Sequence, residues 1–222
     1  MVETQAPTVP RLSGATVARR RARWLGGGTS GNERLTNAGG AVLLVLLAAL
    51  GLTILRIHPL LWVHLFLGIL LIAPVSLKLA STGYRFTRYY THDPAYRRKG
   101  PPPAALRALA PLVVLSTVVV FATGVALLFA GPGSRSTLLP IHKISFFVWL
   151  AVTSLHVLAH LPSMPASLRA DYTRREVLGS SLPGRSGRHL ALAAALVLGV
   201  ALAALTIPEF GPWMHGHLGH DH

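Results

Sequence analysis

Three histidines lie in one apolar stretch of the sequence, IHKISFFVWLAVTSLHVLAHLP at residues 141–162. His142 and His156 are 14 residues apart, so on an α-helix they lie within about 40° of one face and about 21 Å apart along the axis. His160 follows one turn after His156, on the same side. A neutral imidazole can bind a metal or exchange a proton, and the rest of the chain must then position a partner for it.

A second apolar stretch, residues 60–81, carries a similar pair of basic side chains. His64 lies near its beginning, and Lys78 follows 14 residues later on nearly the same helical face. His64 and His142 lie five and two residues after a proline, so their depths differ by about 4.5 Å, which helix tilt can absorb. Two neutral imidazoles on facing helices can ligate a haem iron from its two axial sides. This spacing makes His64 and His142 a candidate pair.

The composition is that of a membrane protein. Of the 222 residues, 51% are hydrophobic and only 13% are charged, whereas soluble domains carry about 25% charged residues. A helix of about 20 apolar residues crosses a bilayer. The sequence therefore predicts an all-α integral membrane protein with five transmembrane helices, at residues 38–56, 60–81, 105–130, 141–161 and 189–207.

The basic residues predict the orientation in the membrane. Of the 21 lysines and arginines, 17 fall in the N-terminal arm and in the loops after the second and fourth apolar segments. Because cytoplasmic loops are enriched in lysine and arginine, we expect a cytoplasmic N-terminus and an extracytoplasmic C-terminus in the inner (plasma) membrane. The net charge of +14 is thereby explained by membrane topology, and no nucleic-acid partner is expected.

Short outer connections at residues 56–59 and 131–140 predict that the first four helices run up-down-up-down in one bundle. Pro59 and Pro140 precede the second and fourth helices, where proline suits a helix start. The fifth helix has no ionisable residue beyond its first turn and is expected to be peripheral. The chain then divides into a disordered basic cytoplasmic arm at 1–37, a four-helix bundle at 38–162, a cytoplasmic loop at 163–188, the fifth helix at 189–207 and a His-rich extracytoplasmic tail at 208–222.

A helix of the form H-x13-H that faces a second histidine helix, and that ends in the H-x3-H of HVLAHL, resembles the b-type membrane cytochromes. That group includes the cytochrome subunits of respiratory complexes and the gamma-subunit type of formate dehydrogenase. The resemblance covers residues 38–162 and rests on a few positions. It implies that His64, His142 and His156 ligate one or two haems b, which exchange electrons with quinone or a partner redox subunit.

The chain departs from the family pattern at Lys78, where a site for two haems would have a fourth histidine. Lysine ligates iron only when it is deprotonated, and near a helix end its ammonium group can reach the aqueous interface instead. The sequence therefore favours one haem over two. His156 and His160 can then hold a second haem with another partner, bind a quinone head group, or only pack between helices.

The absence of other chemistry narrows the choice of function. The chain has no cysteine, which excludes disulfides, thiolate metal sites and covalent haem attachment. It shows no phosphate-binding or dinucleotide-binding motif, and none of its seven acidic residues falls within a predicted span. We therefore expect an electron-transfer subunit of an oxidoreductase complex, not a self-sufficient enzyme.

The C-terminal tail supports a competing hypothesis. His-rich tracts can bind divalent metals such as Zn²⁺, Cu²⁺ or Ni²⁺, although the spacing here matches no defined zinc site. The alternative is a non-redox membrane protein that handles divalent metal or serves as a scaffold. The candidate metal ligands are His215, His217, His220 and His222, beside Asp221.

Overall fold

The computed structural model of the protein describes residues 28–98, 104–160 and 185–215. These residues are almost entirely helical and contain no strand. Five of the spans they form are long and apolar enough to cross a membrane. The predicted all-α membrane fold with five transmembrane helices is confirmed.

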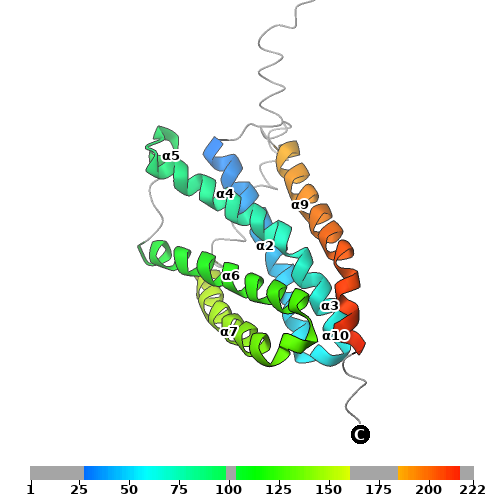
Figure 1. The fold of residues 1–222 in the computed structure, drawn as a ribbon. Coiled ribbons are helices and arrows are strands. Elements are labelled where there is room, and N and C mark those ends of the chain that lie inside the picture. Colours follow the sequence, from blue (N-terminus) through cyan, green and yellow to red (C-terminus); the bar gives the residue numbers. More distant parts are fainter. Residues whose placement is uncertain (1–27, 99–103, 161–184, 216–222) are drawn as a thin grey trace, which may run out of the picture.

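Six long helices form the five spans, because the second span consists of two helices that continue one another across Leu71 (Figure 1). Their bounds are α2, Gly28–Leu55; α3, Ile57–Leu70; α4, Ile72–Tyr90; α6, Ala104–Ala130; α7, Arg135–His160; and α9, Arg185–Leu205. Four short elements complete the described chain: α5, Pro94–Arg98; η1, Pro132–Ser134; η3, Ile207–Phe210; and α10, Gly211–His215.

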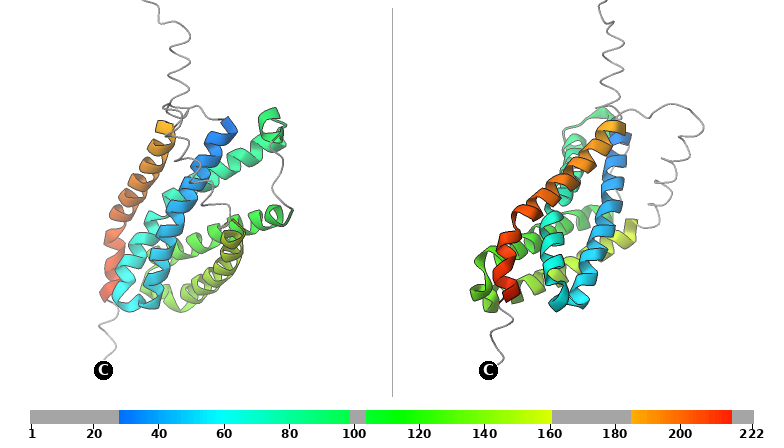
Figure 2. Two further views of the ribbon diagram at one scale, coloured as in Figure 1. Left: turned by 180° about the vertical axis from the view of Figure 1, so that it is seen from behind. Right: turned by 90° about the vertical axis from the view of Figure 1, so that its right-hand side faces the viewer.

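Consecutive spans run antiparallel, as their short connections predict. A single residue separates α2 from α3, and the turn η1 separates α6 from α7. The helices α6 and α7 pack mainly on each other and form a hairpin inclined to α2 and α9 (Figure 2). On the other side of the bundle, α2 and α9 pack on α3 and on its continuation, α4.

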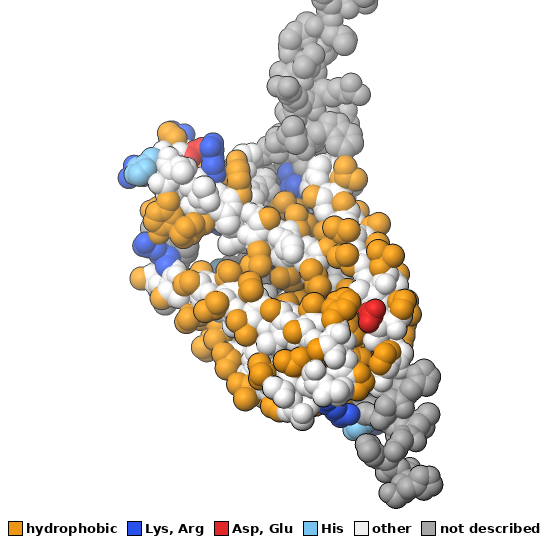
Figure 3. Space-filling model, in the orientation of Figure 1, with side chains coloured by type: hydrophobic (Ala, Val, Ile, Leu, Met, Phe, Trp, Pro, Cys, Tyr) orange, Lys and Arg blue, Asp and Glu red, His pale blue; other side chains and the backbone are white. Residues whose placement is uncertain are grey.

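The surface is apolar around the middle of the molecule. Figure 3 shows hydrophobic side chains over most of the visible face, with lysine and arginine gathered toward the two ends. On α7, Phe147, Leu155 and Leu158 are each more than 60% exposed. Apolar patches of this extent are rare on soluble monomers, and they suit contact with lipid.

The fifth span lies at the edge of the bundle (Figure 1), where it packs closely on α3 and α4. Ala195, Gly199 and Ala203 repeat every fourth residue and are all buried. Small residues at this spacing let helix backbones approach closely in a membrane. The approach is closest at Gly199, because a Cβ atom built there would collide with the carbonyl oxygen of Leu70. Pro74 lacks the N–H group that would normally bond this oxygen.

A buried apolar cluster packs the second span against the C-terminal parts of α6 and α9. Ile69 and Leu70 of α3 meet Leu128 of α6, Ala203 of α9 and Phe210 of η3. Beside them, the buried indole Nε1 of Trp213 donates a hydrogen bond to the carbonyl of Leu128 at 3.2 Å. Residues 208–215, which the sequence assigned to a tail, are therefore part of the folded structure.

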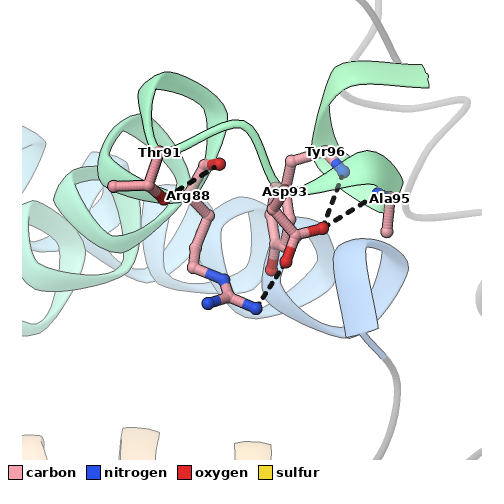
Figure 4. A network of polar contacts seen from close by, with 5 residues as sticks. All are labelled: Arg88, Thr91, Asp93, Ala95 and Tyr96. Carbon is pink, nitrogen blue, oxygen red and sulfur yellow. Dashed lines mark hydrogen bonds and ion pairs between the residues drawn. The ribbon is translucent and has the colours of Figure 1, made fainter.

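One end of the bundle holds α5 against the end of α4 (Figure 4). Asp93 caps α5 by accepting hydrogen bonds from the backbone N–H groups of Ala95 and Tyr96, at 2.9 and 3.4 Å. The same carboxylate forms an ion pair with Arg88 of α4. This end carries the basic loop that we expect in the cytoplasm.

Several predicted boundaries are wrong. The second span continues to Tyr90 instead of ending at residue 81, and the fifth helix begins at Arg185, so residues 185–188 are helical and do not belong to the predicted loop at 163–188. The first helix begins at Gly28, so residues 28–37 are helical and do not belong to a disordered arm. The fourth begins at Arg135, so Pro140 lies inside α7 and does not mark its start. Hydropathy reports the lipid-facing part of a helix, whereas polar turns at its ends extend beyond that part. The predicted arm before residue 28 and the loop at 163–184 lie outside the described residues.

The orientation remains a prediction that follows from the distribution of the basic residues. A reporter that is active only outside the cytoplasm should give signal when it is fused after His222 and none when it is fused after Gly100. The same pair of fusions to a cytoplasm-active reporter should give the reverse pattern. An active external reporter after Gly100 would contradict the orientation.

Candidate functional site

The first candidate pair is His64 of α3 and His142 of α7, the two outer histidines, so called because we expect them toward the extracytoplasmic side. His64 and His142 are both half-buried, and their rings lie within electrostatic range of each other. The sequence predicted this proximity from the shared depth of the two residues on parallel helices. The structure adds a neighbouring helix behind each ring.

Each of these histidines is held by a threonine from the helix before its own. The ring Nδ1 of His64 lies 2.8 Å from the hydroxyl of Thr53 on α2. The ring Nδ1 of His142 lies 3.1 Å from the hydroxyl of Thr123 on α6. The two half-sites therefore have the same construction, with Nδ1 directed at a hydroxyl.

The hydrogen bonds of the threonines favour the same tautomer for the two rings. The Thr53 hydroxyl donates its one proton to the carbonyl of Leu50 at 2.5 Å, and the Thr123 hydroxyl donates to the carbonyl of Val120 at 3.0 Å. With its proton on the carbonyl, each threonine oxygen accepts from the imidazole, and Nδ1 carries the hydrogen. In both rings this assignment leaves the lone pair on Nε2, the nitrogen that faces away from the threonine.

Gly124 provides the space for the His142 ring. A Cβ atom at this position would lie 3.0 Å from Cε1 of His142 and 3.5 Å from its Nδ1. Such contacts are tighter than ordinary van der Waals separation, so a larger residue would push the ring away. Gly51 and Gly68 have no comparable neighbour, since nothing lies within 4 Å of a Cβ atom built at either one.

A polar seam fixes α7 against α6 next to His142. The hydroxyls of Thr123 and Ser145 lie 3.0 Å apart, and Ser145 donates to the carbonyl of His142 at 2.9 Å. One turn further along, Trp149 Nε1 donates to the hydroxyl of Thr117 at 3.1 Å. These contacts restrict rotation of α7 relative to α6, which holds the His142 ring beside Gly124.

The inner pair of the sequence pattern differs from the outer pair. The ammonium group of Lys78 donates a hydrogen bond to the backbone carbonyl of Thr36 at 2.6 Å. The Thr36 hydroxyl lies 3.0 Å from that of Ser81, and Asn32 donates to the carbonyl of Ser81 at 3.0 Å. Lys78 thus acts as a donor that joins α4 to α2. A lysine that ligated iron would have to offer a lone pair instead.

His156 and His160 lie together on α7 with their ring centroids 4.7 Å apart. Lys78 is within electrostatic range of both rings. The Nδ1 atom of His156 is buried and has no hydrogen-bond partner among the described residues. In contrast to the two outer histidines, His156 is therefore not oriented by a neighbouring hydroxyl.

The predicted metal ligands of the tail are largely outside the described part of the chain. Residues 216–222, which include His217, His220 and His222, are not described. His215 is the last residue of α10, and only its backbone is described. Within the described residues, no three histidine or acidic side chains gather as a metal site would require. The tail hypothesis stays a prediction.

Sequence reasoning missed the threonines that orient the outer histidines. Thr53 is 11 residues from His64 and Thr123 is 19 residues from His142, so both contacts depend on how a helical hairpin closes. Threonine in a membrane helix commonly bonds a carbonyl of its own helix, and both residues also do so here. Their sequence positions alone carry no signal for the second contact.

Comparison with known proteins adds no relative. No protein-family model, curated protein or solved structure matches the chain. The class of the protein is therefore defined by its own fold, which is that of a multi-pass helical membrane protein. Any more specific function depends on the site.

Proposed function

We propose that the protein is a membrane electron-transfer subunit that binds one haem b between α3 and α7, with His64 and His142 as its axial ligands. One observation carries the proposal. Both histidines bond a threonine through Nδ1, and this leaves the two Nε2 lone pairs free to ligate iron. Hydrogen bonds of this kind orient metal-bound histidines in proteins and make them better ligands.

The donor set favours haem over a bare metal ion. Structural zinc sites use four protein ligands, and catalytic ones use three. Around His64 and His142, the described residues offer no third histidine or carboxylate. Two axial imidazoles are sufficient for haem, because the porphyrin itself supplies the remaining four nitrogens.

Each residue of the site has a defined task in this proposal. His64 and His142 would bind the iron, Thr53 and Thr123 would hold the two rings in their tautomers, and Gly124 would leave room for the His142 ring. When bound, haem b supplies a centre that takes up one electron and releases it again. The apolar surroundings would limit the access of water to the ligands.

The geometry of the inner residues supports one haem instead of two. Lys78 is engaged as a donor to Thr36, and His156 has no hydroxyl on its Nδ1. The electron partner would be a quinone in the bilayer or another redox subunit, because the sequence shows no second cofactor motif. The absorption spectrum of the purified protein, oxidised and then reduced with dithionite, tests the proposal.

The threonines give a test that is separate from the ligands. Thr53→Val and Thr123→Val keep the shape of the side chain but remove the oxygen that accepts from Nδ1. We expect each variant to bind haem about 10- to 100-fold more weakly, as other losses of outer-shell partners do. Titration of the apoprotein with haem measures this. Thr206→Val, which removes a hydroxyl bonded only within its own helix turn, is the control and should bind haem like the wild type.

A further inference from the structure

The inner end of α7 holds two buried polar atoms that lack partners. They are the hydroxyl oxygen of Thr153 and the Nδ1 of His156, neither of which is bonded to any described residue. The two residues are three positions apart, so they lie on one face of the helix. A buried polar atom without a partner costs about 1–3 kcal/mol. Two such atoms on one face indicate a group that binds there.

A cation lies opposite this face. Lys78 of α4 is half-buried and within electrostatic range of His156 and His160. Its ammonium group has three hydrogens, and its one hydrogen bond to a described residue is the bond to Thr36. Lys78 of α4 therefore lies within electrostatic range of the part of α7 that carries the two unbonded atoms. Among the described helices, α7 packs mainly on α6, and α4 packs mainly on α2 and α9.

The depth of these residues in the membrane specifies the ligand. Lys78 lies 21 residues after the start of α3, and His156 lies 21 residues after the start of α7. Each is therefore about 31 Å from the outer end of its span, which is about the thickness of the hydrocarbon core. This places them toward the opposite boundary of the hydrocarbon core, on the side of the phospholipid head groups of the other leaflet.

The charged residues near this site indicate the charge of the ligand. Neither α4 nor α7 contains an acidic residue. Of the acidic residues described elsewhere, Asp93 is paired with Arg88 and Glu209 lies in η3 at the outer end. Glu33 lies on α2, one turn before Thr36, and has an interaction of its own. An ammonium, a hydroxyl and an imidazole without a facing carboxylate suit a group that is anionic and rich in acceptors.

We propose that Lys78, Thr153 and His156 bind the phosphate group of an anionic phospholipid, which enters between α4 and α7 from the inner leaflet. The ammonium of Lys78 and the hydroxyl of Thr153 would each donate to a phosphate oxygen, and the Nδ1 of His156 would donate to another. The acyl chains would lie along the exposed apolar residues of α7. The site is separate from His64 and His142 and does not depend on haem binding.

Lipid binding to the purified full-length protein tests this proposal. Delipidated protein in a neutral detergent is titrated with phosphatidylglycerol or phosphatidylcholine, and bound lipid is counted by native mass spectrometry. We expect a saturable phosphatidylglycerol site and no equivalent site for phosphatidylcholine. Lys78→Met and Thr153→Val should each weaken phosphatidylglycerol binding about tenfold, as expected for the loss of a charge-assisted hydrogen bond. Lys78→Arg should retain most of the affinity.

Lys143→Met is the matched control, because it removes an exposed cation from the outer part of the same helix. It should leave the affinity for phosphatidylglycerol unchanged.

Inorganic phosphate is included as a competitor. If it displaces the lipid at equal concentration, the site binds free anions and the proposal is overturned. Displacement by a short-chain quinone would assign the site to quinone instead. Equal binding by wild type, Lys78→Met and Thr153→Val would also overturn it. If Lys78→Met no longer elutes as a single species in gel filtration, the binding measured for Thr153→Val tests the proposal, because this variant changes no charge.

Discussion

Replacing either His64 or His142 with alanine should abolish the low-spin spectrum of the reduced protein. Each variant removes one of the two proposed axial ligands, and the described residues place no other histidine beside the remaining one. The pocket would then be empty or hold haem with a single protein ligand. Difference spectra of the reduced and oxidised purified variants, normalised to protein, measure the loss. We expect the low-spin signal to fall below about a tenth of that of the wild type.

His58→Ala provides the matched control for this experiment. His58 lies six residues before His64, in the first turn of α3, and is exposed. Its removal should leave the spectrum unchanged. Gel filtration and the helical signal of each variant separate ligand loss from misfolding. A full low-spin spectrum in folded His64→Ala would show that the pairing is wrong. A wild-type protein that binds no haem when haem is plentiful would refute the cytochrome proposal itself.

The number and type of the helices could be predicted from the sequence because lipid imposes a simple requirement. A segment that crosses a bilayer must satisfy its backbone groups internally and present apolar side chains outward. Both requirements produce long apolar segments, which can be recognised in a single sequence. Polar turns that continue a helix beyond the lipid leave no such mark, so the beginnings of α2 and α7 were missed. Asn32, for example, reads as a loop residue, but it bonds the Ser81 carbonyl on α4.

For the candidate site, the sequence could predict which residues share a face of one helix, but not which residues of different helices are in contact. Fourteen residues return a helix to nearly the same face, so the spacing predicted that His64 and Lys78 share one face and His142 and His156 another. The predicted similar depth of His64 and His142 came from their distances to Pro59 and Pro140. Contacts between different helices depend on rotation and crossing, which the sequence pattern does not define. The threonines behind the outer histidines and the bond from Lys78 to Thr36 are contacts of this kind.

The close approach of α9 to the second span gives the clearest prediction about stability. Gly199→Ala adds one methyl group, and its Cβ would collide with the carbonyl oxygen of Leu70. The methyl group cannot be accommodated by rotation of a side chain, because the obstacle is backbone. Either α9 must move away or the helix around Leu70 must bend, and overpacking of this kind costs about 1–3 kcal/mol.

Gly51→Ala is the corresponding control, because Gly51 also lies inside a span but a Cβ atom there would meet nothing within 4 Å. Alanine is favoured over glycine within a helix by about 1 kcal/mol, so this variant should be as stable as the wild type or more stable. The midpoint of thermal unfolding in detergent compares the three proteins. Gly199→Ala should unfold at a lower temperature than the wild type, and Gly51→Ala should not. If Gly199→Ala were as stable as Gly51→Ala, the tight contact between α9 and Leu70 would not exist in the folded protein. The same result would remove α9 as the support that holds the second span, with His64 and Lys78, in place.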